Sequence, residues 1–145
     1  MDKSALLTLA DSLLSESKTA ILSTVSSEGP KMRWMSPIFL KNDPEHIYAI
    51  TSNSFNKTND ISSNENVQWM LQNKSLDTII TFNGSIKSVE NLSLRTEVLE
   101  TVGQQLQTFW KINNDPSSLT VLDTDIESAV VFFPVKGKKY LVSFK

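Results

Sequence analysis

The chain has 145 residues, of which 39% are hydrophobic, which is enough for a packed core and argues against disorder. Fourteen basic and sixteen acidic residues leave a net charge of −2, which gives no indication of binding to nucleic acid or to an anionic membrane. No apolar run approaches the roughly 20 residues of a membrane span, and no secretory signal pattern is evident. Without cysteine, disulfides, thiol catalysis and thiolate metal sites are excluded. We expect one cytoplasmic domain over residues 1–145.

The first predicted element is an amphipathic helix over residues 3–17. Its apolar residues recur at helical spacing, and Asp2 or Ser4 could cap its start. Residues 19–26 then read as a strand, 27–30 as a turn, and 31–40 as a second strand of a hairpin with a longer loop. Pro37 lies inside that second strand and indicates a sheet edge or a bulge.

The remaining pattern alternates strands with short breaks and contains two more helical segments. Residues 54–63 form a short polar segment that Ser54 could cap as a helix, and residues 93–109 carry a clear apolar stripe. Further strands are predicted at 47–51, 67–71, 77–89, 119–122, 128–133 and 139–144, with the segment 77–89 read as one strand or as two around Asn83-Gly84.

Strands dominate this pattern, and most are separated by turns too short for parallel crossovers. Tightly connected neighbours are therefore antiparallel, which favours a mainly β fold with flanking helices, a closed or partly closed barrel. A doubly wound parallel sheet does not fit.

The single histidine, His46, falls in the turn-forming cluster at 42–46, and we interpret it as an exposed turn residue. The chain therefore lacks the histidines that a catalytic serine triad or a multi-histidine metal site would need. We expect no catalytic residue and no metal ligand in the chain. Trp69 is assigned to the core.

The residues best suited to chemistry lie between Gly29 and Val67. In an extended strand Arg33 shares a face with Lys31 and Met35, and its planar guanidinium suits a phosphate, although a solvated surface charge is the ordinary alternative. Thr51 and Ser52 end a predicted strand, and Lys57 opens a predicted helix. Hydroxyls, a helix N-terminus and a lysine together favour an anion.

These residues resemble the pyridoxamine 5′-phosphate oxidase-related split barrels that bind FMN, in particular the general stress protein branch. The matching positions are Gly29-Pro30-x-x-Arg33-x-Met35, the strand end at Thr51, and the set Lys57, Ile61, Asn64 and Val67. The resemblance continues through Thr81-Phe-Asn-Gly84, Ile86-Lys87-Ser88-Val89, Trp110 and Asp115-Pro116, and covers roughly residues 5–144.

The resemblance implies an antiparallel Greek-key split β-barrel that forms a homodimer with two FMN sites at the subunit interface. Arg33 and Lys57 would hold the FMN phosphate, with Thr51 and Ser52 beside them. Three further residues would lie near the flavin or its ribityl chain: Trp34, Met35 and Ile50. Trp110 would reach the flavin of the partner subunit, with a core position at the end of the second helix as the alternative.

The sequence also departs from the family pattern. Ser54-Phe55-Asn56-Lys57 lacks a positive charge of the fuller motif, Asn64-Glu65-Asn66 replaces the usual Asn-Pro, and Asn91 replaces a frequent acidic residue. The chain ends without the arginine- and histidine-bearing segment that true pyridoxamine 5′-phosphate oxidases use, so we do not expect vitamin B6 oxidation.

Three functions follow from the resemblance. The first is an FMN-dependent oxidoreductase of unknown substrate, with NAD(P)H as the candidate donor; a flavin carries the redox chemistry itself, which agrees with the shortage of cysteine and histidine. The second is a flavin-binding protein without turnover. The third is a cofactor-free interaction protein on the same fold. FAD or a deazaflavin is the alternative cofactor, and neither nucleic acid nor membrane is expected as a partner.

Overall fold

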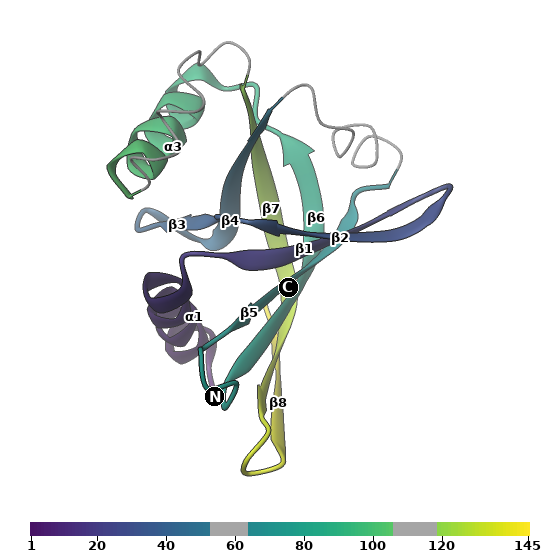
Figure 1. Ribbon diagram of the computed structural model, residues 1–145. Coiled ribbons are helices and arrows are strands. Elements are labelled where there is room, and N and C mark those ends of the chain that lie inside the picture. Colours follow the sequence, from purple (N-terminus) through teal and green to yellow (C-terminus); the bar gives the residue numbers. More distant parts are fainter. Residues whose placement is uncertain (53–63, 106–118) are drawn as a thin grey trace.

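The computed structural model describes residues 1–52, 64–105 and 119–145, and it consists mainly of antiparallel strands with two helices (Figure 1). The helices are α1 (Lys3–Ser17) and α3 (Leu92–Gln105). The strands are β1 (Ala20–Ser26), β2 (Gly29–Met35), β3 (Ile38–Leu40), β4 (Asp43–Ser52), β5 (Asn66–Gln72), β6 (Ile79–Ser88), β7 (Leu119–Phe133) and β8 (Lys138–Ser143). The predictions for residues 54–63 and 106–109, and the family match at Trp110 and Asp115-Pro116, lie outside the described residues.

The strands form one sheet in the order β2-β1-β5-β6-β7-β4-β3, and β8 pairs with β7. Every pairing is antiparallel, as the sequence predicts. β2 and β3 follow each other in the chain but lie at opposite ends of this order, so the barrel is split there. The predicted strand 31–40 therefore divides at Ser36 and Pro37, where proline has no N–H to continue a ladder.

The hairpin loop between β1 and β2 is shorter than the sequence predicts. Ser26 pairs with Gly29, so only Ser27 and Glu28 connect β1 to β2. Gly29 has a φ of 107°, a conformation that glycine adopts without steric cost. The prediction of a longer loop was wrong because Gly29 and Pro30 belong to β2.

Two strands extend well beyond their predicted bounds. β4 begins at Asp43, so that Pro44 and His46 are strand residues and the turn is limited to residues 41–42. β7 runs without a break through the segment that separated two predicted strands. β6 is one strand with a register shift at Asn83/Gly84, where a Cβ on Gly84 would lie 2.4 Å from a backbone carbonyl oxygen.

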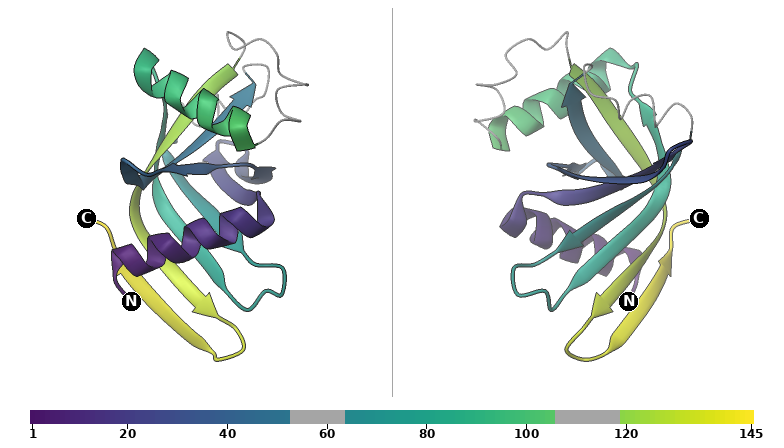
Figure 2. Two further views of the ribbon diagram at one scale, coloured as in Figure 1. Left: turned by 90° about the vertical axis from the view of Figure 1, so that its left-hand side faces the viewer. Right: turned by 45° about the vertical axis from the view of Figure 1, so that its right-hand side comes forward.

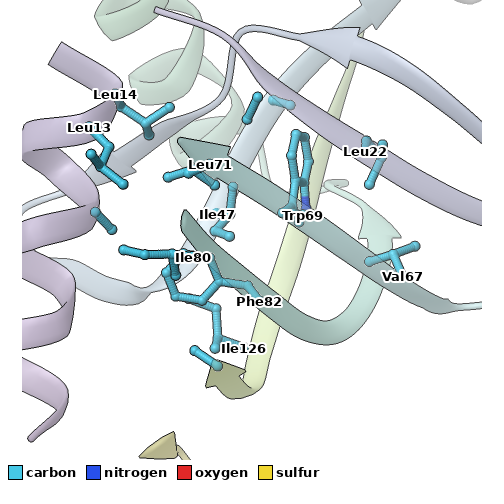
Figure 3. Close-up of a cluster of buried hydrophobic side chains, with 14 of the residues drawn as sticks. Leu13, Leu14, Leu22, Ile47, Val67, Trp69, Leu71, Ile80, Phe82 and Ile126 are labelled. Carbon is cyan, nitrogen blue, oxygen red and sulfur yellow. The ribbon is translucent and has the colours of Figure 1, made fainter. Parts of the chain in front are cut away.

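The main hydrophobic core fills the inner side of the sheet. Alternate residues of the strands point into it, including Leu22, Val67, Trp69, Leu71 and Phe82 (Figure 3). Figure 2 shows α1 lying across the strands, and its buried residues Leu6, Ala10, Leu13 and Leu14 belong to this core. The side chain of Asp2 caps α1 by accepting a hydrogen bond of 2.8 Å from the Ala5 N–H, which confirms one of the two predicted caps.

A smaller core lies on the other side of β4 and β7, under α3. Val98 and Val102 of the predicted helical stripe are buried there against Tyr48, Ile50 and Val121. Within the described ranges, no helix is both long enough and apolar enough to cross a membrane.

Candidate functional site

β2 presents its residues to two opposite sides, as the sequence predicts. Lys31 and Arg33 are partly buried and Met35 is buried in the main core, whereas Met32 and Trp34 point outward. The Trp34 side chain is 62% exposed. The side chains of Arg33 and Trp34 therefore cannot meet the same face of a ligand. A ligand that touches both must lie along the edge of β2.

The Arg33 guanidinium is anchored to the neighbouring strand. Its Nη1 donates a hydrogen bond of 2.8 Å to the hydroxyl of Thr24 on β1, which is fully buried. Arg33 and Leu22 are cross-strand partners, so the arginine leans along the inner side of the sheet to reach Thr24. This bond fixes the position of a cation whose planar fork suits an oxyanion.

The end of β4 lies beside β7 and places successive side chains on opposite sides. Ile50 packs in the smaller core under α3. Thr51 alternates with it and so shares the inner side with Ile47 and Ala49, which belong to the main core. Thr51 is only 3% exposed, and its cross-strand partner is Thr120.

The hydroxyl of Thr51 has no hydrogen-bond partner within the described part of the chain. Two other buried threonines on the inner side are satisfied, because Thr24 accepts from Arg33 and Thr124 accepts from the Trp69 indole N–H at 2.9 Å. A buried hydroxyl without a partner costs about 1–3 kcal/mol. The Thr51 hydroxyl is therefore free to donate a hydrogen bond to a bound ligand. Gln72 Oε1 is the other buried side-chain atom without a partner.

Part of the predicted site lies beyond what the structure describes. Lys57 and Trp110 fall outside the described residues, and of Ser52 only the backbone is described, in β4 beside Leu119. The predicted association of Arg33 with Lys57 therefore stays a prediction. Of the predicted site residues, the structure describes Arg33, Met35 and Thr51 on the inner side of the sheet, Ile50 in the smaller core and Trp34 on the outer side.

A large groove of the described structure lies elsewhere, between α1, the β3–β4 turn and α3. It has a volume of about 990 Å³, and Leu7, Phe39 and Leu40 contribute its apolar lining. An ion pair of 3.1 Å between Lys3 and Glu45 joins α1 to β4 beside it. None of the predicted site residues that the structure describes lines this groove.

The prediction for His46 was wrong. His46 belongs to β4, its side chain is only 26% exposed, and its Nδ1 lies 2.7 Å from Oδ1 of the buried Asp123 on β7. Its Nε2 faces Asp43 at 3.6 Å and Asp125 at 3.8 Å. The sequence could not reveal this cluster because β4 and β7 become neighbours only in the folded sheet. Among the described residues, no three acidic or histidine side chains are placed to hold a metal ion.

A family model described as pyridoxamine 5′-phosphate oxidase matches residues 8–130, which is most of the chain. The chain belongs to the pyridoxamine 5′-phosphate oxidase family. This confirms the resemblance that the residues between Gly29 and Val67 indicated. A search of curated protein sequences finds no match.

Solved structures show the same split-barrel fold. A Clostridium acetobutylicum protein related to general stress protein 26 is 15% identical, with a TM-score of 0.76 over 97% of this chain and 95% of that one. A FAD-binding protein from Mesorhizobium loti is 11% identical, with a TM-score of 0.67 over 86% and 91%. HutZ, the haem storage protein of Vibrio cholerae, is 16% identical, with a TM-score of 0.70 over 92% and 95%.

Proposed function

We propose that this member of the pyridoxamine 5′-phosphate oxidase family binds FMN where β2 and the end of β4 come to the inner side of the barrel, and acts as a flavin-dependent oxidoreductase. The observation that carries the proposal is the buried Thr51 hydroxyl, which has no partner among the residues that the structure describes. A phosphate oxygen would supply the missing acceptor. The fold and the family support a flavin, because one structural relative is a FAD-binding protein.

Two described side chains would hold the phosphate. Thr51 would donate its hydroxyl proton, and Arg33, held in place by Thr24, would supply the positive charge. Ser52 and Lys57 are the further phosphate ligands that the sequence predicts. Each charge-assisted hydrogen bond of this kind contributes about 1.5–3 kcal/mol.

The edge of β2 suits the flat ring of a flavin. Among the described strands β2 pairs only with β1, so its other backbone edge faces away from the sheet. An unpaired strand edge presents a row of N–H and C=O groups. The polar edge of the ring would meet that row, and Met35 and Ile50 are the further flavin contacts that the sequence predicts. Trp34 on the outer side, and Trp110 from the partner subunit of a homodimer, complete the proposed contacts.

A bound flavin supplies hydride and electron transfer. The protein then needs to bind and orient the flavin and to exclude water from it. This role agrees with the side chains present. The chain has no cysteine, and its single histidine, His46, is engaged by Asp123 on the other side of β4. NAD(P)H is the proposed electron donor.

The first experiment is a comparison of FMN with riboflavin, which lacks the phosphate, by absorbance after desalting and by calorimetric titration. We expect FMN to bind at least tenfold more tightly than riboflavin, and Thr51→Val to reduce that difference. Equal affinities for FMN and riboflavin would show that the phosphate does not bind at this site. Retained flavin is then treated anaerobically with NADH or NADPH. Bleaching supports the oxidoreductase, and its absence supports flavin binding without turnover.

Two alternatives share the same fold. HutZ stores haem, so haem is titrated alongside FMN and FAD. The lone His46 already contacts three carboxylates, which makes it a poor axial ligand in the described geometry. A colourless protein that gives no heat with FMN, FAD or haem would favour the cofactor-free interaction protein, the function that the changes at Phe55 and Asn56 motivate.

A further inference from the structure

The charges of the chain are unevenly distributed along it. Residues 128–145 contain no acidic residue and four lysines, namely Lys136, Lys138, Lys139 and Lys145. Residues 1–127 contain the other ten basic residues and all sixteen acidic ones, so their net charge is −6. The expectation of no anionic partner rests on the net charge of the whole chain, which conceals this separation. A charge asymmetry of this kind favours contact with an anionic partner such as a membrane or a nucleic acid.

Three of these lysines lie at the free end of the β7–β8 hairpin. We define residues 132–140 as the hairpin end, which comprises the last residues of β7, the turn and the first residues of β8. β6 begins at Ile79, opposite Phe132, so the pair of Phe133 and Lys138 and the turn project past this neighbouring strand. Figure 1 and Figure 2 show the hairpin, in yellow, reaching beyond the β5–β6 turn. The hairpin end can therefore approach a flat surface ahead of the sheet.

The apex of the hairpin end is apolar. The N–H of Gly137 donates a hydrogen bond of 3.2 Å to the carbonyl oxygen of Pro134, which closes a turn with Val135 and Lys136 at its centre. Val135 is 86% exposed, the highest value among the large exposed hydrophobic side chains of the described residues. The closed turn holds this side chain away from both hydrophobic cores.

Behind the apex, aromatic rings and lysines surround the hairpin. The ammonium group of Lys136 lies 5.8 Å from the centre of the Phe133 ring, and that of Lys139 lies 5.2 Å from the centre of the Phe132 ring. Successive residues of a strand point to opposite sides, so each side of the hairpin carries an aromatic ring with a lysine over it. The ring of Tyr140 packs edge-on against Phe133, with the two centres 6.0 Å apart.

We propose that the hairpin end binds the surface of an anionic lipid bilayer. None of its three lysines forms an ion pair with a described residue, so their charges are available to lipid phosphates. Aromatic rings and lysines at one level, with an apolar side chain beyond them, suit the boundary between headgroups and acyl chains. Val135 enters this boundary, and the lysine ammonium groups stay at the level of the headgroups. The acidic remainder of the chain is repelled by the same surface, which orients the hairpin end towards it.

The same features argue against a nucleic acid as the partner. Bases stack on open aromatic faces, whereas a lysine lies over the rings of both Phe132 and Phe133. The hairpin end contains no arginine, asparagine or glutamine, the side chains that make bidentate contacts to base edges. An exposed valine gains nothing from contact with phosphates, but it leaves water when it enters a bilayer.

The test is co-sedimentation of the full-length protein with vesicles at low ionic strength. Neutral vesicles of phosphatidylcholine are compared with vesicles of an equimolar mixture of phosphatidylcholine and anionic phosphatidylglycerol. We expect binding to the mixed vesicles alone, and weaker binding as salt is added. A lysine near an anionic surface strengthens binding about fivefold, so the double variant Lys138→Gln and Lys139→Gln should bind about 25-fold more weakly. The matched control is Lys18→Gln with Lys41→Gln, which removes the same charge at two exposed positions elsewhere and should bind as the parent does.

A second measurement locates the contact at the apex. The chain has no cysteine, so Val135→Cys provides a single position for a fluorophore that responds to the polarity of its surroundings. Its emission should shift to the blue with mixed vesicles and stay unchanged with neutral ones. Leu92→Cys is the control, because Leu92 is 77% exposed on α3, at the other end of the molecule (Figure 1), and its emission should not shift.

Circular dichroism checks that each variant is folded. A parent protein that does not bind mixed vesicles at low salt would overturn the proposal, and so would equal losses of binding in the two double variants. A single-stranded oligonucleotide that binds as tightly as the vesicles, and is lost with Lys138 and Lys139, would assign the hairpin end to nucleic acid instead. The vesicle measurements are made with and without FMN, so a failure to bind flavin would contradict the proposed function and leave this proposal standing.

Discussion

Trp69 on β5 donates its indole N–H to the hydroxyl of Thr124 on β7 across the interior of the barrel, at 2.9 Å. The two strands are not neighbours, because β6 lies between them in the sheet. Both residues are fully buried. The bond therefore ties two separate strands together within the core, and it satisfies the one polar atom of the largest buried side chain.

Thr124→Val should destabilise the protein by about 1–3 kcal/mol, because the indole N–H would be left buried without an acceptor. Urea unfolding followed by tryptophan fluorescence measures the change. Thr124→Ser is the control, since it keeps the hydroxyl and should cost only about 1 kcal/mol for the lost methyl group. Equal stability of the parent and the valine variant would show that the bond contributes nothing.

Thr51→Val should have the opposite effect on the apoprotein. The parent buries a hydroxyl without a partner, so replacing it by a methyl group should raise the free energy of unfolding, by about 1 kcal/mol or more. The same change should weaken FMN binding. Thermal unfolding with and without FMN measures both. Thr51→Ser keeps the hydroxyl and should bind FMN as the parent does. A valine variant that is less stable would argue that the hydroxyl is satisfied inside the protein.

Arg33→Ala should cost about 1.5–3 kcal/mol of FMN binding, because it removes a charge-assisted contact to the phosphate. Thr24→Val should cost less, since it frees the guanidinium from its 2.8 Å anchor without removing the charge. Lys31→Ala is the control on the same face of β2, where Lys31 pairs with Glu28 at 3.4 Å. Titration calorimetry compares the three. Similar losses of FMN affinity in Lys31→Ala and Arg33→Ala would indicate a general electrostatic attraction rather than a defined phosphate site.

Tyr48 should make the fold sensitive to alkaline pH. Burial, and then the hydrogen bond that its hydroxyl donates to Asp43, raise the pKa of Tyr48 well above its ordinary value of 10.0. Above pH 10 the unfolded chain loses this proton while the folded chain keeps it. The unfolded state then binds fewer protons, so the free energy of unfolding falls as the pH rises, by up to about 1.4 kcal/mol per pH unit.

Denaturant titrations at pH 8 to 11 measure that fall. Tyr48→Phe has no proton to lose, and its stability should decline less steeply than that of the parent. At pH 7 the phenylalanine variant should be within about 1.5 kcal/mol of the parent, because Asp43 is partly exposed and can turn to water. Parallel pH profiles for the two proteins would contradict the role of Tyr48.

Local patterns in the sequence determined much of the molecule. The apolar spacing and the Asp2 cap defined α1 to the residue, and strict alternation assigned Arg33 and Trp34 to opposite sides of β2. Trp69 is in the core as expected. Helical spacing and strand alternation depend on residues that are near one another in the chain, so the sequence contains them directly.

Only the tertiary structure decided which distant residues meet. The split at Pro37 sends β2 and β3 to opposite ends of the sheet, and the pairing of β4 with β7 brings His46 beside Asp123, 77 positions away. Whether Thr51 finds a hydrogen-bond partner also depends on that pairing. A hairpin register follows from its turn, but which distant strands pair, as β1 with β5 and β4 with β7, depends on packing in the folded sheet.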